Sequence, residues 1–99
     1  MADPIRVAIV EDQPRVRDGL ATLIAGTPGY EMTGAYGSME TALAALTAYL
    51  PDVLLLDIEL PGISGIDGLR LLRRQYPESR VLMLTVFSDS DRVFEAICA

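Results

Sequence analysis

The chain has 99 residues, with 14 Asp and Glu against 8 Lys and Arg and no histidine, so its formal net charge is −6 at pH 7. This length allows a single domain, residues 1–99. The negative charge disfavours contact of this segment with nucleic acid phosphates, and the lack of histidine excludes histidine acid–base chemistry and most zinc sites.

Cys98 is the only cysteine, which excludes a disulfide within the chain and favours a reducing compartment. The first residues lack the basic start and apolar run of a signal peptide, and no apolar stretch is long enough to span a bilayer. We therefore expect a cytoplasmic protein with no membrane segment.

Short apolar runs alternate along the chain with segments whose apolar residues recur at helical spacing. Residues 5–10 form the first run, and residues 14–25 then predict a helix, with Pro14 suited to its first turn. Residues 30–36 alternate as a strand does, and Gly34 favours an edge position for it.

The second half of the chain repeats this alternation of helices and strands. Ser38 is expected to cap a helix. The expected elements are a helix over 38–49, a strand over 53–56, a helix over 66–76, a strand over 80–84 and a last helix from Asp89. The continuous apolar runs at 53–56 and 80–84 predict strands buried on both faces. The order predicts the α/β class, with a doubly wound parallel sheet.

Polar side chains stand where the central strands of this sheet end. Glu11 and Asp12 follow the first strand, Asp57 follows the third and Thr85 the fourth. Ligands of doubly wound sheets lie beyond the carboxyl ends of the strands, so three carboxylates and one hydroxyl should converge there. Singly, such residues often cap helices or are merely solvated; four at one edge favour a functional site.

Three clustered carboxylates repel one another unless a cation lies among them. Oxygen ligands of this kind suit Mg²⁺, which keeps several waters and also binds phosphate oxygens. An aspartate beside such a cation is a competent nucleophile toward a phosphoryl donor and would give an acyl phosphate. Asp57 is the candidate nucleophile, and the Thr85 hydroxyl would donate a hydrogen bond to a phosphoryl oxygen.

Four segments together resemble the receiver domain of bacterial two-component response regulators. They are 7–14 (VAIVEDQP), 51–62 (PDVLLLDIELPG), 64–68 (SGIDG) and 81–85 (VLMLT). Residues 84–87 and 91–97 are in addition similar to the LuxR-type subfamily. In that subfamily a helix-turn-helix DNA-binding domain usually follows the receiver.

The resemblance implies a flavodoxin-like fold and a role for each residue of the acidic set. Asp57 would be the phosphoacceptor, and Asp12 and Asp57 would bind Mg²⁺ directly with the backbone carbonyl of Glu59. Glu11 would act mostly through metal-bound water, and Thr85 would be the switch hydroxyl. The implied partner is a sensor histidine kinase, with DNA bound only through a C-terminal domain.

Parts of the family pattern are absent from the 99 residues. The family has a lysine and an aromatic residue on a fifth strand, followed by a fifth helix; this chain contains no lysine and ends at Ala99. We therefore expect a fragment or part of a longer protein, with strand order 2-1-3-4. The fourth strand should then present an open edge that favours self-association.

Two alternatives compete with the phosphoacceptor switch. A haloacid-dehalogenase type enzyme would carry Asp-x-Asp after its first strand and a downstream lysine, whereas Asp57-Ile58-Glu59 lies in mid-chain and lysine is lacking. An interaction module that works without phosphorylation is disfavoured by the intact acidic set, while the missing lysine keeps it open. Labelling with Mg²⁺ and a small phosphodonor distinguishes the switch from such a module.

Overall fold

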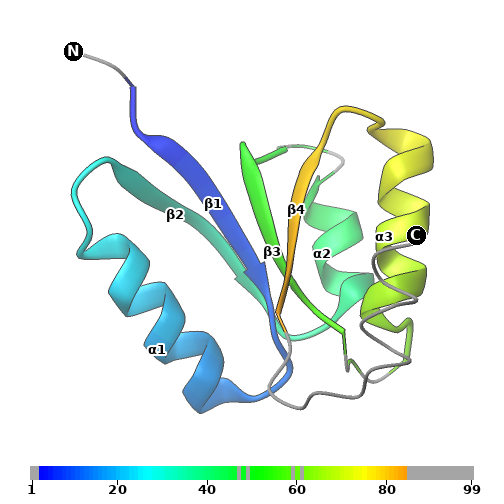
Figure 1. Ribbon diagram of the computed structural model, residues 1–99. Coiled ribbons are helices and arrows are strands. Elements are labelled where there is room, and N and C mark those ends of the chain that lie inside the picture. Colours follow the sequence, from blue (N-terminus) through cyan, green and yellow to red (C-terminus); the bar gives the residue numbers. More distant parts are fainter. Residues whose placement is uncertain (1–2, 47, 49, 59, 61, 85–99) are drawn as a thin grey trace.

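A computed structural model of the chain describes residues 3–46, 48, 50–58, 60 and 62–84 (Figure 1). The elements are β1 (Ile5–Val10), α1 (Pro14–Ala25), β2 (Tyr30–Tyr36), α2 (Met39–Leu46), β3 (Val53–Asp57), α3 (Gly65–Gln75) and β4 (Arg80–Leu84). Within these described residues, no helix has both the length and the apolar character needed to cross a membrane.

The four strands form one parallel sheet in the order β2-β1-β3-β4, which confirms the predicted order. β2 lies at an edge, as Gly34 suggested. Its register against β1 shifts after Val7, because Val7 pairs with Met32 while Ala8 pairs with Gly34. The hydroxyl of Thr33, the residue left over, donates to the carbonyl oxygen of Val7 at 3.2 Å. The glycine thus belongs to a bulge of the edge strand.

The helices are divided between the two faces of the sheet. α1 lies on one face, and α2 and α3 lie together on the other (Figure 1). The main core forms beneath α2 and α3, where Met39, Leu46 and Leu72 are buried against side chains of β1 and β3. α1 buries none of its residues fully and packs mainly on β2 and β1.

Strand β4 departs from the expectation that it is buried on both faces. Val81 and Met83 pack against the core under α2 and α3, but Leu82 is 60% exposed. The reason is the coverage of the sheet: on the α1 side, the only described helix packs over β2 and β1. A continuous apolar run therefore did not indicate two covered faces here.

The predicted helix ends need small corrections. α2 ends at Leu46 in the structure, and Ala48 lies in a turn, so the predicted end at residue 49 was too late. The amide of Thr41 donates to Oγ of Ser38 at 3.2 Å, which confirms Ser38 as a capping residue. α3 begins one residue before the predicted 66, and the predicted helix from Asp89 lies outside the described residues.

Candidate functional site

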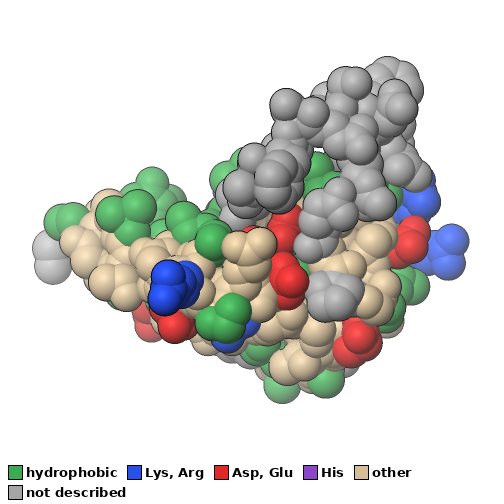
Figure 2. Space-filling model, turned by 90° about the horizontal axis from the view of Figure 1, so that it is seen from below, with side chains coloured by type: hydrophobic (Ala, Val, Ile, Leu, Met, Phe, Trp, Pro, Cys, Tyr) green, Lys and Arg blue, Asp and Glu red, His purple; other side chains and the backbone are tan. Residues whose placement is uncertain are grey.

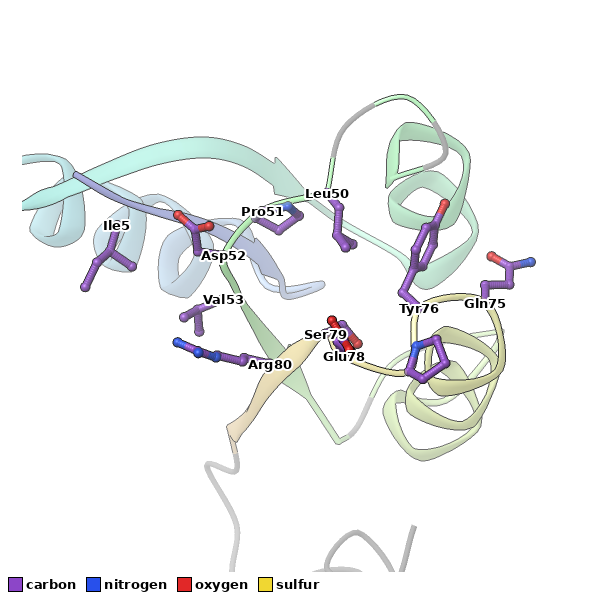
Figure 3. Close-up of a pocket in the computed structure, with 11 residues that line it drawn as sticks. Ile5, Leu50, Pro51, Asp52, Val53, Gln75, Tyr76, Glu78, Ser79 and Arg80 are labelled. Carbon is purple, nitrogen blue, oxygen red and sulfur yellow. The ribbon is translucent and has the colours of Figure 1, made fainter. Parts of the chain in front are cut away.

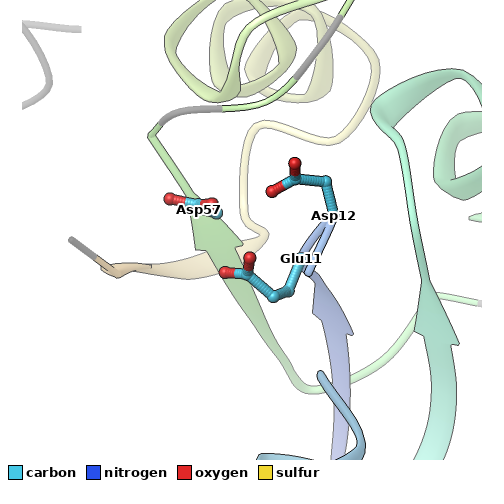
Figure 4. Close-up of side chains that lie close together, drawn as sticks. All are labelled: Glu11, Asp12 and Asp57. Atoms are coloured by element: carbon cyan, nitrogen blue, oxygen red, sulfur yellow. The ribbon is translucent and has the colours of Figure 1, made fainter. Parts of the chain in front are cut away.

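Three carboxylates meet at the carboxyl ends of the two central strands. Glu11 and Asp12 directly follow β1, and Asp57 is the last residue of β3. Because β1 and β3 are parallel neighbours, their ends bring these side chains together (Figure 4). One oxygen from each residue lies within 4.8 Å of the others. A view onto this edge of the sheet shows acidic side chains near its middle (Figure 2).

The three side chains differ in their exposure to solvent. Glu11 is 1% exposed and Asp57 is 5% exposed, whereas Asp12 is open to solvent. Burial raises the pKa of the Glu11 carboxyl to about 7, against a lowering by the hydrogen bond from the Gln13 amide, and the nearby Asp57 and Asp12 raise it further. The Glu11 carboxylate is therefore packed where negative charge is costly.

This arrangement fits a hard cation. Oε1 of Glu11 accepts a hydrogen bond from the amide of Gln13 at 3.1 Å. Oε2 is buried and has no hydrogen-bond partner among the described residues, although such an atom normally has one. Three carboxylates with one buried, unsatisfied oxygen form an all-oxygen donor set of the kind that Mg²⁺ prefers. A cation there would offset the repulsion among the three carboxylates.

The connection after β3 is held by contacts that the sequence pattern did not indicate. Gly65 lies against the backbone of Asp57, where a Cβ atom would collide with the Asp57 carbonyl group. Oε1 of Glu40, at the start of α2, accepts a hydrogen bond of 3.1 Å from the Ile63 amide. Gly62 has a φ of +70°, and a Cβ atom there would lie 2.6 Å from Oε2 of Glu40. The sequence signal that could have indicated this tight connection was the succession of Gly62, Ser64 and Gly65.

The structure thus brings together three of the five predicted site residues. Glu11, Asp12 and Asp57 form the cluster as expected. Glu59, predicted to offer its backbone carbonyl, and Thr85, predicted to offer its hydroxyl, lie outside the described residues.

A separate pocket of about 790 Å³ lies at the opposite, amino edge of the sheet (Figure 3). Its lining includes Leu50, Val53, Tyr76 and Arg80, and none of the three carboxylates of the cluster. No pattern in the sequence predicted this pocket. The three clustered carboxylates lie at the carboxyl edge of the sheet, and we assign the candidate functional site there.

Comparison with known proteins identifies this arrangement. The family model described as "Response regulator receiver domain" matches residues 7–99. The chain belongs to this receiver family. The match runs from within β1 through β4 and includes all three clustered carboxylates.

Curated relatives include bacterial transcriptional regulators. The chain is 37% identical over 98 residues to the nitrate/nitrite response regulator protein NarP of Escherichia coli, covering 99% of this chain and 46% of NarP. It is 34% identical over 97 residues to the uncharacterized transcriptional regulatory protein YxjL of Bacillus subtilis, covering 98% of this chain and 44% of YxjL. The receiver chain thus spans less than half the length of these relatives.

Solved structures confirm the flavodoxin-like receiver fold. The receiver domain of the putative response regulator NarL from Mycobacterium tuberculosis aligns with a TM-score of 0.90 at 27% identity, covering 98% of this chain and 78% of that one. The response regulator TrrA from Thermotoga maritima, solved in complex with Mg²⁺ and BeF, aligns with a TM-score of 0.83 at 29% identity, covering 95% and 80%. A LuxR-family response regulator from Aurantimonas is also similar, with a TM-score of 0.88 at 29% identity, covering 96% of this chain and 68% of that one.

Proposed function

We propose that the chain is a Mg²⁺-dependent phosphoacceptor switch in which Asp57 takes the phosphoryl group. The observation that carries this proposal is the position of Asp57, buried at the end of β3 and within 4.8 Å of two further carboxylates. A carboxylate nucleophile is helped by a cation that neutralises the charge on the phosphoryl group, and this cluster offers the oxygen ligands for such a cation. The similarity to TrrA, whose structure holds Mg²⁺ and BeF, supports the same use of the acidic edge.

Each residue of the set has a proposed role. Asp12 and Asp57 would hold Mg²⁺ directly, together with the Glu59 backbone carbonyl, and Glu11 would act through water on the cation. When bound, the cation neutralises charge on the phosphoryl oxygens. An oxygen of the Asp57 carboxylate bonds to phosphorus as the bond between phosphorus and the donor's leaving atom breaks. The Thr85 hydroxyl then donates a hydrogen bond to a phosphoryl oxygen.

The switch works with partners and is not a turnover enzyme. The donor is a sensor histidine kinase in the cytoplasm, and the chain assists only its own phosphorylation and dephosphorylation. Longer relatives such as the DNA-binding transcriptional activator DevR/DosR of Mycobacterium tuberculosis, 36% identical over 95 residues, support a role in transcription. In this proposal a separate C-terminal domain binds DNA, which agrees with the net charge of −6 of the receiver chain.

Self-association of the 99-residue chain is also proposed. Among the described strands, β4 pairs only with β3, and Leu82 at its centre is 60% exposed. An apolar edge strand is a template for pairing with another chain. The proposed partner at this edge of β4 is a second copy of the chain.

Mass spectrometry after incubation with MgCl₂ and acetyl phosphate tests the phosphoacceptor assignment. Asp57 should carry the added phosphoryl group, and hydroxylamine should remove it as from an acyl phosphate. Asp57→Asn should abolish labelling, whereas Asp67→Asn, which removes an exposed carboxylate on α3, should leave it intact. Equal labelling of the Asp57→Asn variant at another side chain contradicts the proposal.

A further inference from the structure

The first turn of α1 carries an arginine whose side chain folds back onto the loop that bears Glu11 and Asp12. Nη1 of Arg17 donates a hydrogen bond of 2.9 Å to the backbone carbonyl oxygen of Glu11. The backbone amide of Arg17 also donates to the carbonyl oxygen of Gln13, at 2.9 Å. One residue therefore holds both ends of the loop formed by residues 11–13.

Two other hydrogen bonds fix Glu11 from different sides. Its amide donates to the carbonyl oxygen of Tyr36 at 3.0 Å, and its Oε1 accepts from the Gln13 amide at 3.1 Å. With Arg17, these contacts engage the backbone N–H, the backbone carbonyl and one carboxylate oxygen of Glu11. Only Oε2, which is buried, has no hydrogen-bond partner among the described residues. Three polar groups of Glu11 are thus held, and its second carboxylate oxygen is left for a cation.

The connection between β2 and α2 leaves space for the guanidinium group. A Cβ atom on Gly37 would lie 3.1 Å from Nη1 of Arg17, which is closer than an ordinary van der Waals contact. Arg17 itself is half-buried, unlike Arg15 in the same turn, which is exposed and whose side chain has no hydrogen bond or ion pair in the described part of the chain. The Arg17 side chain is thus held in place by its contacts, whereas the Arg15 side chain is solvated.

We propose that Arg17 is a positioning residue of the cation site, holding the Glu11 carbonyl so that the carboxylates of Glu11 and Asp12 face Asp57. This inference rests on the proposed function, because it takes the three carboxylates as a Mg²⁺ site. Groups that orient metal ligands without touching the metal are commonly worth about 10–100-fold in metal affinity. The same order of effect is expected for Arg17.

Titration of the ¹⁵N-labelled chain with MgCl₂ tests this role. Arg17→Ala should weaken Mg²⁺ binding by about 10-fold or more and should shift the Gln13 amide resonance even without metal. Arg17→Lys, which keeps one charged donor, should restore part of the affinity. Arg15→Ala removes the same charge from the same turn and should bind Mg²⁺ as the wild type does.

Urea unfolding of each variant separates positioning from general stability. A merely structural arginine would lower the free energy of unfolding and leave the Mg²⁺ affinity of the folded chain unchanged, and that result overturns the inference. Gly37→Ala, which crowds the guanidinium without removing it, should also weaken Mg²⁺ binding and serves if Arg17→Ala does not fold. If the wild type binds Mg²⁺ and neither Arg17→Lys nor Gly37→Ala changes the affinity, the positioning role of Arg17 is refuted while the proposed function stands. A wild type that binds no Mg²⁺ refutes the proposed function as well.

Discussion

Gly65 lies so close to Asp57 that a Cβ atom on the glycine would collide with the aspartate's backbone carbonyl group. The Gly65 amide meanwhile donates to the carbonyl oxygen of Ile58 at 3.2 Å. The first turn of α3 is therefore packed directly on the end of the strand that carries the proposed phosphoacceptor. Its position depends on a residue without a side chain.

Gly65→Ala should lower the free energy of unfolding by about 1–3 kcal/mol, because the added methyl group forces the helix and the strand apart. Urea denaturation measures this change. Gly19→Ala is the matched control, since a Cβ atom at Gly19 in α1 meets nothing within 4 Å. That variant should gain about 0.5–1 kcal/mol from the better helix propensity of alanine. A loss of similar size at both positions contradicts the packing argument.

Asp12→Asn should weaken Mg²⁺ binding by about 10-fold or more, because it removes the charge of a proposed direct ligand; each factor of 10 corresponds to about 1.4 kcal/mol. Isothermal titration calorimetry with MgCl₂ measures the affinity. Asp18→Asn removes an exposed carboxylate from α1 and should leave the affinity unchanged. Equal affinities of the Asp12→Asn variant and the wild type refute the ligand assignment.

The raised pKa of Glu11 makes the metal-free chain less stable as pH rises. The folded chain binds the Glu11 proton more tightly than the unfolded chain, because the pKa is about 7 in the fold against an ordinary value of 4.5. Between these two pH values the folded state holds more protons, so its free energy of unfolding falls by about 3 kcal/mol. Above pH 7 the loss is complete.

Urea denaturation in EDTA at pH 4.5, 6 and 8 tests this expectation. Glu11→Gln, which cannot ionise and keeps an acceptor for the Gln13 amide, should flatten the pH dependence between pH 4.5 and 7. Saturating MgCl₂ should offset the loss for the wild type at pH 8 by binding to the ionised cluster. A wild-type stability that rises through this pH range in EDTA counts against the burial of Glu11 as the dominant cause.

Much of the site could be predicted because parallel strands bring their carboxyl ends together. The apolar runs before Glu11 and Asp57 indicated two buried strands, and the polar residues after them had to share one edge. The prediction required no knowledge of the loops. Thr85 and Glu59 stay predictions, since they lie outside the described residues.

The supporting contacts could not be predicted in the same way, because they depend on loop conformation. By helical spacing alone, Arg17 and Arg73 fall on the polar faces of their helices. In the fold, Nη1 of Arg17 donates to the Glu11 carbonyl, and Nη1 of Arg73 donates to the Ser79 carbonyl at 2.9 Å. The exposure of Leu82 was missed for a different reason: an apolar run does not reveal which face a helix covers.

Asp52 should stabilise the fold above its ordinary pKa of 3.8 and lose that effect in acid. Its carboxylate accepts hydrogen bonds from the side chain of Arg6, at 3.2 and 3.1 Å, and from the Arg6 amide, at 2.8 Å. These contacts lower the pKa of Asp52 in the folded state, and the hydrogen bonds from the Arg6 side chain have the largest effect. The contribution is therefore full above pH 3.8 and disappears as pH falls through the lower, folded value.

Acid unfolding followed by circular dichroism measures the Asp52 contribution. Asp52→Asn should be less stable than the wild type at neutral pH, and the difference should shrink as the wild type is acidified below pH 3.8. Asp18→Asn retains the Arg6–Asp52 pair and should keep the wild-type acid loss. A constant difference between Asp52→Asn and the wild type from pH 7 to pH 2 shows that ionisation of Asp52 is not the cause.

The 99-residue chain should self-associate through β4. Val81, Leu82 and Met83 form an apolar run without a charge at an edge of the described sheet, and Leu82 is 60% exposed. Leu82→Glu places a charge at the centre of this edge strand and should shift the chain toward monomer.

Leu23→Glu is the control, because Leu23 on α1 is 66% exposed and lies on a helix that packs mainly on β2 and β1. Sedimentation velocity over a range of concentrations separates the outcomes: the wild type and Leu23→Glu should show growing larger species, and Leu82→Glu should not. A wild type that stays monomeric at every concentration and unfolds cooperatively shows that the described core is sufficient alone and that β4 does not pair with a second copy.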